Sequence, residues 1–201
     1  MKVDIVDERG FDLAMYGIGL SYGLTSNMSY GEYLQDIEMS DKLYDVSLKL
    51  APKGKGHNKF LEHLDVFMIV DAPRYFFAQL DTYRVGVSKN SESTMHTILK
   101  VPFTQESFGG FDFDEPIPET TIQRLESLRH QKKWRQLKRE LPESFIQRRT
   151  IKLSYMNLRN VIIQRVNHRL AEWQYFCGEV MDQVRYPEYL EDVYKTRKEN
   201  V

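Results

Sequence analysis

Apolar side chains occupy every second position of residues 64–71, and the positions between them hold Asp, Phe, Ile and Asp. This period of two is typical of a β-strand, here with one buried face and a second face that is partly covered. The segment is therefore the best candidate for the central strand of a sheet. Pro73 suits the first turn of a following helix, because its missing amide hydrogen costs nothing there, and that helix has an apolar side made of Tyr75, Phe76, Phe77 and Leu80.

Shorter signals place other elements before this strand. Residues 2–6 alternate like a short strand. Residues 11–20 predict a short helix that ends in the glycine-rich loop 17–23. Residues 41–50 predict a second helix, which the turn at 51–56 stops.

The second half of the chain is helical in character. Residues 101–118, rich in Phe, Gly, Asp and Pro, predict a long loop of the kind that serves as a functional flap or a subunit contact. Three helices are predicted after it, at residues 118–137, 149–165 and 170–184, and a Leu-Pro pair at 141–142 breaks the first. The sequence thus predicts an α+β fold, one domain over residues 1–201 with a small β-sheet packed with helices and a helix-rich C-terminal half.

The overall composition argues against several classes of function. At 41% hydrophobic residues, the 201-residue chain can bury a core. Its formal net charge is −1, so no global field attracts nucleic acid or an anionic membrane, and no apolar run is long enough for a membrane span. Cys177 is the only cysteine and no signal-type apolar run begins the chain, so we expect a cytoplasmic protein. The five histidines lack zinc-ligand spacing, and no metal site is expected.

Two polar stretches lie between apolar elements, at residues 56–63 (GHNKFLEH) and 83–96 (YRVGVSKNSESTMH). The chain has no GxGxxG or Walker-type nucleotide fingerprint. Polar groups this dense predict a binding site, although each stretch has a structural alternative. His57 suits a simple turn, Glu62 and His63 suit the start of the next strand, and the polar side chains of 88–93 suit an ordinary loop.

Together with a C-terminal pattern, these stretches resemble the flavin-dependent thymidylate synthases of the ThyX type. Family members have GHxTPFEH where this chain has residues 56–63, and their signature RHRxxSxNExSxRY falls without a gap on residues 83–96. A Ser-Tyr-Gly near the family's N-terminus is similar to residues 21–23. The family's NxR, Arg and HAQWE positions are similar to residues 157–159, Arg165 and residues 168–173.

The resemblance implies a homotetramer that binds FAD and deoxyuridine monophosphate (dUMP) at subunit interfaces. In that family the flavin takes a hydride from NADPH, methylenetetrahydrofolate supplies the carbon, and dUMP is reductively methylated to dTMP. No cysteine nucleophile is needed. The position of Cys177 agrees with this. It lies on the apolar side of a predicted helix, where a cysteine has a structural role.

The resemblance also carries three sets of site residues onto this chain, none of them a metal ligand. Catalytic roles fall on Ser93 and Arg165. Contacts to the cofactor are implied for His57, Glu62, Tyr83, Arg84, Val85, Asn157, Arg159 and His168. Contacts to the pyrimidine nucleotide are implied for Ser88, Asn90, Ser91, Ser93, Lys138, Arg139 and Arg165.

Several positions depart from the family pattern. The flavin-gripping RHR is replaced by Tyr83, Arg84 and Val85. Ser91 stands in place of a glutamate, and Met95 in place of an arginine whose bidentate hold on phosphate a methionine cannot imitate. A compensating cation is available at Lys138 or Arg139. The family's phosphate-binding arginine lies four residues before the proline of its Leu-Pro, and Lys138 has that spacing.

These departures leave two other hypotheses open: an enzyme that modifies another pyrimidine nucleotide, for example by hydroxymethylation, and a catalytically silent nucleotide-binding homologue without a redox cofactor. Structural alternatives also remain for the basic residues. A solvated helix face is the alternative for Arg159, Arg165 and Arg169. For Arg148 and Arg149 the alternative is a pair of solvent-exposed side chains. The aromatic residues 75–77 suit the core or a subunit interface rather than flavin stacking.

Overall fold

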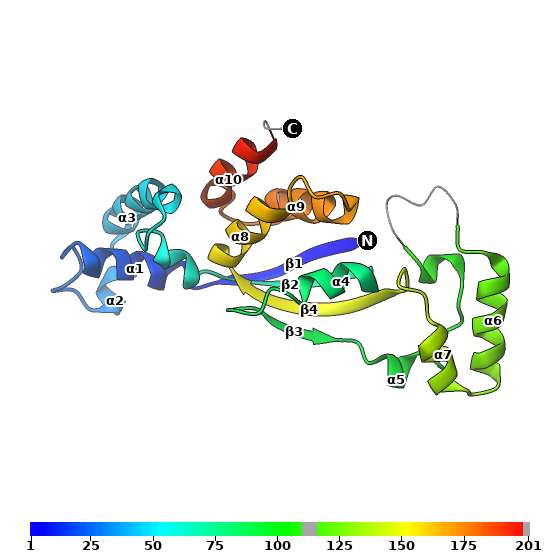
Figure 1. The fold of residues 1–201 in the computed structure, drawn as a ribbon. Helices are drawn as coiled ribbons and strands as arrows, with labels where there is room; N and C mark the ends of the chain where they lie inside the picture. Colours follow the sequence, from blue (N-terminus) through cyan, green and yellow to red (C-terminus); the bar gives the residue numbers. More distant parts are fainter. Residues whose placement is uncertain (110–115, 199–201) are drawn as a thin grey trace.

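A computed structural model describes residues 1–109 and 116–198 of the chain. One antiparallel sheet lies at its centre, in the strand order β1-β2-β4-β3, and consists of β1 (Lys2–Arg9), β2 (Asp65–Pro73), β3 (Ser88–Ser91) and β4 (Ile146–Ser154). Figure 1 shows this sheet in the middle of an elongated molecule, with a group of helices at each end. The fold is α+β, and the alternating segment is a central strand, as predicted.

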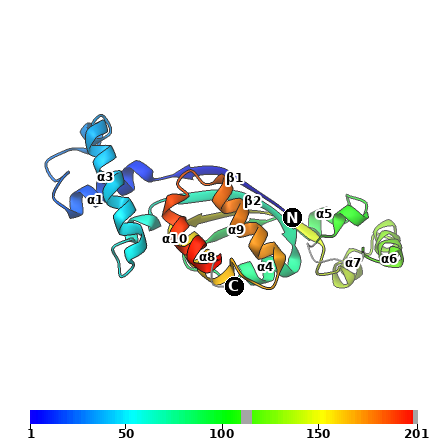
Figure 2. The same cartoon turned by 90° about the horizontal axis from the view of Figure 1, so that it is seen from above.

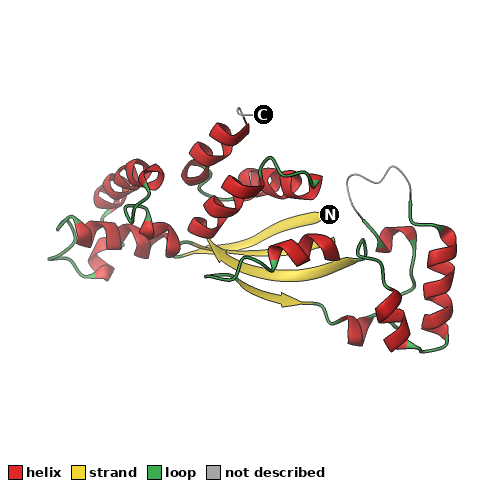
Figure 3. Cartoon of the chain, viewed as in Figure 1, coloured by secondary structure: helices red, strands yellow, loops and turns green. Residues whose placement is uncertain are grey.

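Helices cover one face of the sheet (Figures 2 and 3). They are α4 (Arg74–Leu80), α8 (Tyr155–Arg165), α9 (Ala171–Gln183) and α10 (Glu188–Lys198). The covered face of β2 buries Val66, Met68 and Val70, and Phe76 and Phe77 of α4 are fully buried against the same core. The alternation of β2 therefore directs one apolar row under the helices, while the half-buried row between them faces the other side.

The first group of end helices comprises α1 (Phe11–Ser21), α2 (Tyr30–Tyr33) and α3 (Ile37–Leu50), followed by short 3₁₀ turns at Ala51–Lys53 and Lys59–Glu62. The predicted glycine-rich loop at 17–23 is wrong in its first half, because α1 continues through Gly17 and Gly19. A Cβ on Gly19 would lie 2.4 Å from the Thr25 side chain, so this glycine allows the chain after α1 to pack against the helix.

The opposite end contains α5 (Thr94–Thr97), a 3₁₀ turn (Gln105–Ser107), α6 (Glu119–His130) and α7 (Trp134–Glu140). The single helix predicted over 118–137 is wrong: Lys132 has a φ of 55°, which separates α6 from α7. This end has its own hydrophobic core, to which Leu128 and Leu137 contribute. The predicted loop at 101–118 anchors Phe103 and Phe108 in that core, and its residues 110–115 lie outside the described part of the chain.

The helix predicted over 149–165 is also wrong, because its first residues belong to β4. They pair with β2 along the whole strand, from Asp65 opposite Ser154 to Pro73 opposite Ile146. The helix α8 begins only at Tyr155, where Ser154 and Asn157 cap each other's backbone amides. Pro73 ends β2 and forms the N-cap of α4, one position earlier than predicted, while α9 confirms the helix predicted over 170–184.

Among the described residues, no helix has the length and apolar character needed to cross a membrane. The same part of the chain contains no group of three or more His, Cys, Asp or Glu side chains placed to hold a metal ion. Cys177 is fully buried on α9 beside Trp173 and Phe176, as expected of a structural thiol.

Candidate functional site

A cleft of about 550 Å³ lies where α4, β4, α7 and the β3–α5 connection meet. We call it the Ser93 cleft. Three of the residues predicted to contact the nucleotide line it, namely Ser91, Ser93 and Lys138. Met95 lines it as well. The cleft therefore brings the end of β3 and the start of α5 together with the last turn of α7, which lies more than forty residues later in the sequence.

Two arginines that the sequence analysis missed as site residues complete the wall of the Ser93 cleft. Arg149 of β4 donates from Nη1 to both carboxylate oxygens of Asp81, at 2.9 and 3.0 Å, and its guanidinium lies 4.1 Å above the ring of Phe77. It is therefore not part of a solvated pair. Arg74 donates to the Leu141 carbonyl at 3.0 Å and pairs with Glu143 at 3.1 Å, which ties α4 to the end of α7.

The cationic side chains in and near the Ser93 cleft differ in whether they have hydrogen-bond or ion-pair partners. Lys138 is exposed and makes no hydrogen bond or ion pair with any described residue. Arg139, the other proposed compensating cation, does not line the cleft. Behind the cleft, the Lys89 ammonium donates to the carbonyls of Leu80 and Tyr83 at 2.8 Å each and lies 3.5 Å from Asp81. Burial lowers the pKa of Lys89, and the charge of Asp81 opposes that shift.

A second cluster surrounds Arg165 at the end of α8. Its Nε donates to the Tyr83 hydroxyl at 3.0 Å, and its guanidinium lies 4.9 Å from the Trp173 ring. Gln79 accepts from both Arg165 Nη1 and the Trp173 indole. His168 lies beside Trp173, and its Nδ1 accepts from the Leu170 amide at 3.1 Å. The structure thus brings Tyr83, Arg165 and His168 together, although Arg165 does not line the Ser93 cleft.

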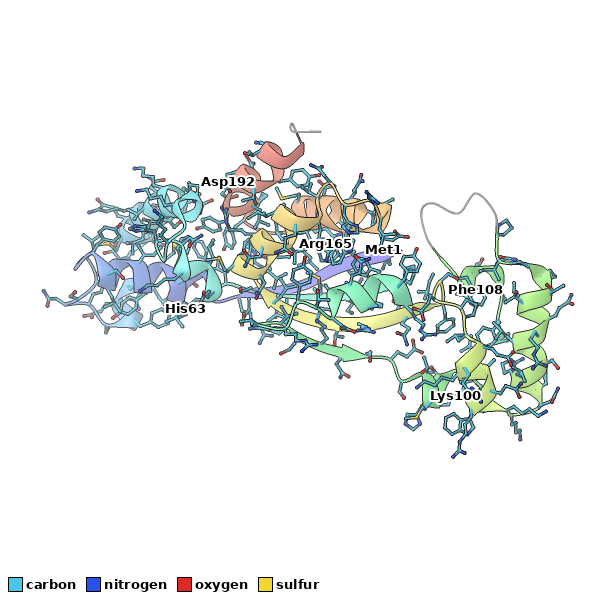
Figure 4. The ribbon with its side chains drawn as sticks, in the orientation of Figure 1. Met1, His63, Lys100, Phe108, Arg165 and Asp192 are labelled. Carbon is cyan, nitrogen blue, oxygen red and sulfur yellow. The ribbon has the colours of Figure 1, made fainter. Side chains whose placement is uncertain are left out.

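The remaining predicted residues are dispersed. His57 lines a largely apolar pocket of about 550 Å³ between α1 and the turn before β2, with His63 on the same wall. Figure 4 shows His63 at the α1–α3 end, Arg165 among the helices over the sheet, and Lys100 at the opposite end. Ser88 and Asn90 lie on the edge strand β3, paired with Lys152 and Thr150 of β4. One chain does not gather its predicted residues into one site.

The side chains implied to hold FAD form two sets. His57, Glu62 and Arg84 are exposed, and their side chains make no hydrogen bond or ion pair with described residues, so they fit a bound cofactor. Arg159 does not fit. Its side chain is 7% exposed, and its guanidinium donates to the Asp192 carboxylate and the Tyr189 carbonyl, which also excludes a solvated helix face for this residue.

Asn157 also belongs to the second set, because its side chain is already hydrogen-bonded within the chain. Its Oδ1 accepts from the Ser154 amide at 3.1 Å, and its Nδ2 donates to the Val85 carbonyl at 2.9 Å. This bond holds the loop before β3 against α8, beside Gly86, which has a φ of 70°. A flavin would therefore be held by fewer side chains than the resemblance implies.

Comparison with known proteins identifies the architecture. No family model matches the chain, and no curated protein sequence matches it. Two structures of thymidylate synthase ThyX from Helicobacter pylori, each with FAD and dUMP, align with TM-scores of 0.75 and 0.76 at 19% identity, over 96% and 97% of this chain and 99% of theirs. The chain has the ThyX fold.

A third structure extends this ThyX-like set. The UMP/dUMP methylase PolB from Streptomyces cacaoi, bound with 5-Br dUMP, aligns with a TM-score of 0.65 and 14% identity, over 97% of this chain and 94% of PolB. The resemblance inferred from short motifs is thus confirmed at the level of the fold. Residue roles do not follow from a shared fold alone.

Proposed function

We propose that this protein is a pyrimidine-nucleotide methylase of the ThyX type, with dUMP as its substrate. The observation that carries the proposal is the Ser93 cleft. It assembles Ser91 and Ser93, assigned to nucleotide contact from the signature motif, with Lys138, assigned from its spacing before Pro142, within a ThyX fold. Hydroxyl groups beside an unpaired ammonium are suited to a phosphorylated sugar.

The proposed methylation needs groups that this chain does not contain. FAD would relay a hydride from NADPH, and methylenetetrahydrofolate would supply the carbon. Of the residues implied to hold the flavin, Arg84 offers a cation without a partner among the described residues, and His57 offers an exposed ring. Ser93 and Arg165 remain the proposed catalytic residues.

A homotetramer with sites shared between subunits is part of the same proposal. Among the residues predicted to share one site, His57 lies against α1, Lys138 on α7 and Arg165 on α8, and Figure 1 shows these helices at one end, at the other end and in the middle of the elongated molecule. Copies packed side by side would bring these groups together.

The experiment for the reaction measures tritium release from C5-tritiated dUMP with NADPH, FAD and methylenetetrahydrofolate. We expect release that requires all of them. No release at high protein concentration would exclude reductive methylation of dUMP. UMP is tested in parallel, because PolB is described as acting on both nucleotides. The mass of the product distinguishes a methyl from a hydroxymethyl group and so tests the hydroxymethylase alternative.

A catalytically silent nucleotide binder is the second candidate, and the engagement of Arg159 with Asp192 favours it. The visible absorption spectrum of the purified protein, recorded with and without added FAD, separates the two. Flavin bands that survive desalting support the methylase. A colourless protein that cannot be reconstituted, and that dUMP still stabilises against heat, supports the binder.

A further inference from the structure

We propose that Arg149 and Lys138 together form a phosphate-binding site in the Ser93 cleft, which we call the phosphate seat. They take the place of the signature arginine whose position Met95 occupies. The inference rests on the proposed function only in taking a pyrimidine nucleoside monophosphate as the ligand. It adds Arg149, on a strand outside every motif of the resemblance, as a residue that sets specificity for the phosphorylated form.

Arg149 is held so that part of its guanidinium stays available. Asp81 accepts from Nη1 alone, and Phe77 packs under the plane at 4.1 Å. Nη2 makes no hydrogen bond with any described residue, and Nε has none either but is shielded from water. The side chain is only 15% exposed, so its position is fixed by packing. A fixed guanidinium with an unused Nη2 is a preorganised donor for an anion.

The position of Arg149 follows from the strand that the sequence analysis missed. Arg148 and Arg149 are neighbours on β4 and point to opposite faces of the sheet. Arg148 forms a bidentate ion pair with Asp71, with both hydrogen bonds at 2.7 Å. Arg149 lies on the α4 side of the sheet and lines the cleft. Only one of the two charges is therefore directed at the ligand.

Lys138 and Ser93 supply the other side of the seat. The Lys138 ammonium approaches from α7 without a described partner, and the Ser93 hydroxyl makes no hydrogen bond within the described residues. Two cations suit the charge of a phosphate monoester. When the anion binds Arg149, Lys89 at 3.5 Å still balances Asp81. Glu92 and Glu143 also line the cleft and limit how much additional negative charge it accepts.

The test compares the affinities of dUMP and deoxyuridine, which lacks the phosphate, by titration calorimetry on the full-length protein. We expect dUMP to bind at least about 100-fold more tightly. Lys138→Gln should reduce that ratio about 10-fold. Arg149→Lys, which keeps the charge but loses Nη2, should reduce it by a similar factor. Affinity for deoxyuridine should change little in either variant.

Matched controls use cations that neighbour the seat without lining it. Arg148→Gln removes the adjacent charge on β4, and Arg135→Gln removes a charge from α7. Both should leave the dUMP to deoxyuridine ratio unchanged. Lys138 is exposed, so Lys138→Gln is expected to fold normally even if Arg149→Lys lowers the melting temperature.

Three results would overturn the inference: equal binding of dUMP and deoxyuridine by the unaltered protein, no detectable binding of either dUMP or inorganic phosphate, or a ratio that both seat variants preserve. Tritium release is a separate readout. A ratio that depends on Lys138 and Arg149 without any turnover would keep the phosphate seat and reject the methylase. Turnover together with a dUMP to deoxyuridine affinity ratio that neither variant changes would support the methylase and reject the phosphate seat.

Discussion

The Nε atom of Arg165 donates to the hydroxyl of Tyr83 at 3.0 Å. Tyr83 stands where the ThyX signature begins with an arginine. A second guanidinium at that place would repel Arg165, whereas a phenol accepts from it and donates onward to Gln164 at 2.9 Å. The change from arginine to tyrosine therefore fixes the position of Arg165 instead of adding a charge.

Tyr83→Phe tests this role. The variant keeps the ring but leaves the Arg165 Nε without its acceptor, so we expect a loss of about 1 kcal/mol in the free energy of unfolding. We also expect kcat/KM for dUMP to fall about 10-fold, because Arg165 is less well oriented. Tyr16→Phe is the control, since it removes a hydroxyl bonded to the Met28 carbonyl at 2.8 Å, far along the chain from Arg165. Equal losses of kcat/KM in both variants would contradict the prediction.

The ion pair between Arg159 and Asp192 should contribute more to stability than an ordinary surface pair. Asp192→Asn leaves the Arg159 guanidinium, on a side chain that is 7% exposed, without its carboxylate, and we expect the free energy of unfolding in urea to fall by about 2 kcal/mol. Glu191→Gln removes the adjacent carboxylate, which pairs with Lys195 on the surface, and should cost less than about 0.5 kcal/mol. Indistinguishable unfolding midpoints would show that α10 is not held by Arg159.

His168 should make stability depend on pH. Burial, and next the charges of Arg165 and Arg169, lower its pKa from the ordinary 6.5. The native state then binds fewer protons than the unfolded chain, so the contribution of His168 is complete above about pH 6.5 and is lost as the pH falls through its native pKa. The melting temperature of the unaltered protein should therefore fall more between about pH 7.5 and pH 5 than that of His168→Gln. A larger fall in the variant would contradict this sign.

The two glycines inside α1 should respond to alanine in opposite directions. Gly19→Ala places a methyl group 2.4 Å from Thr25, so we expect a loss of about 1–3 kcal/mol. No atom lies within 4 Å of a Cβ on the exposed Gly17, and Gly17→Ala should stabilise the helix by about 0.5–1 kcal/mol. Chemical denaturation of both variants measures the difference. Destabilisation by both would show that the helix does not pass through these positions.

The main error in the sequence-based fold concerned residues 149–165, and its cause is physical. Ile151 and Leu153 alternate as in a strand, but Val161 and Ile162 continue an apolar pattern of helical spacing, and no proline or glycine separates them. What decides for a strand is pairing with β2, about eighty residues earlier, which a local pattern does not contain. The central strand itself was predictable because its alternation is complete within one short segment.

In the candidate site, too, the residues with a local sequence signal were predictable and those that depend on distant contacts were not. Ser91, Ser93 and Lys138 were predictable because they lie in motifs or at a fixed spacing from one. Arg149 was not, since its direction depends on β4, and the engagement of Arg159 depends on α10, which was not predicted. The separation of α6 from α7 depends on one residue, Lys132, in a conformation with positive φ that the sequence does not signal.

The strand order β1-β2-β4-β3 also determines when the protein can fold during its synthesis. β1 and β2 can pair as soon as residue 73 has left the ribosome, but β2 then has one open edge until residues 146–154 emerge. β3 has no partner strand among the described residues until that moment, because β4 is its one neighbour in the described sheet. A nascent chain of about 140 residues therefore exposes an apolar strand edge, and chaperone capture or aggregation of such truncated chains is the expected consequence.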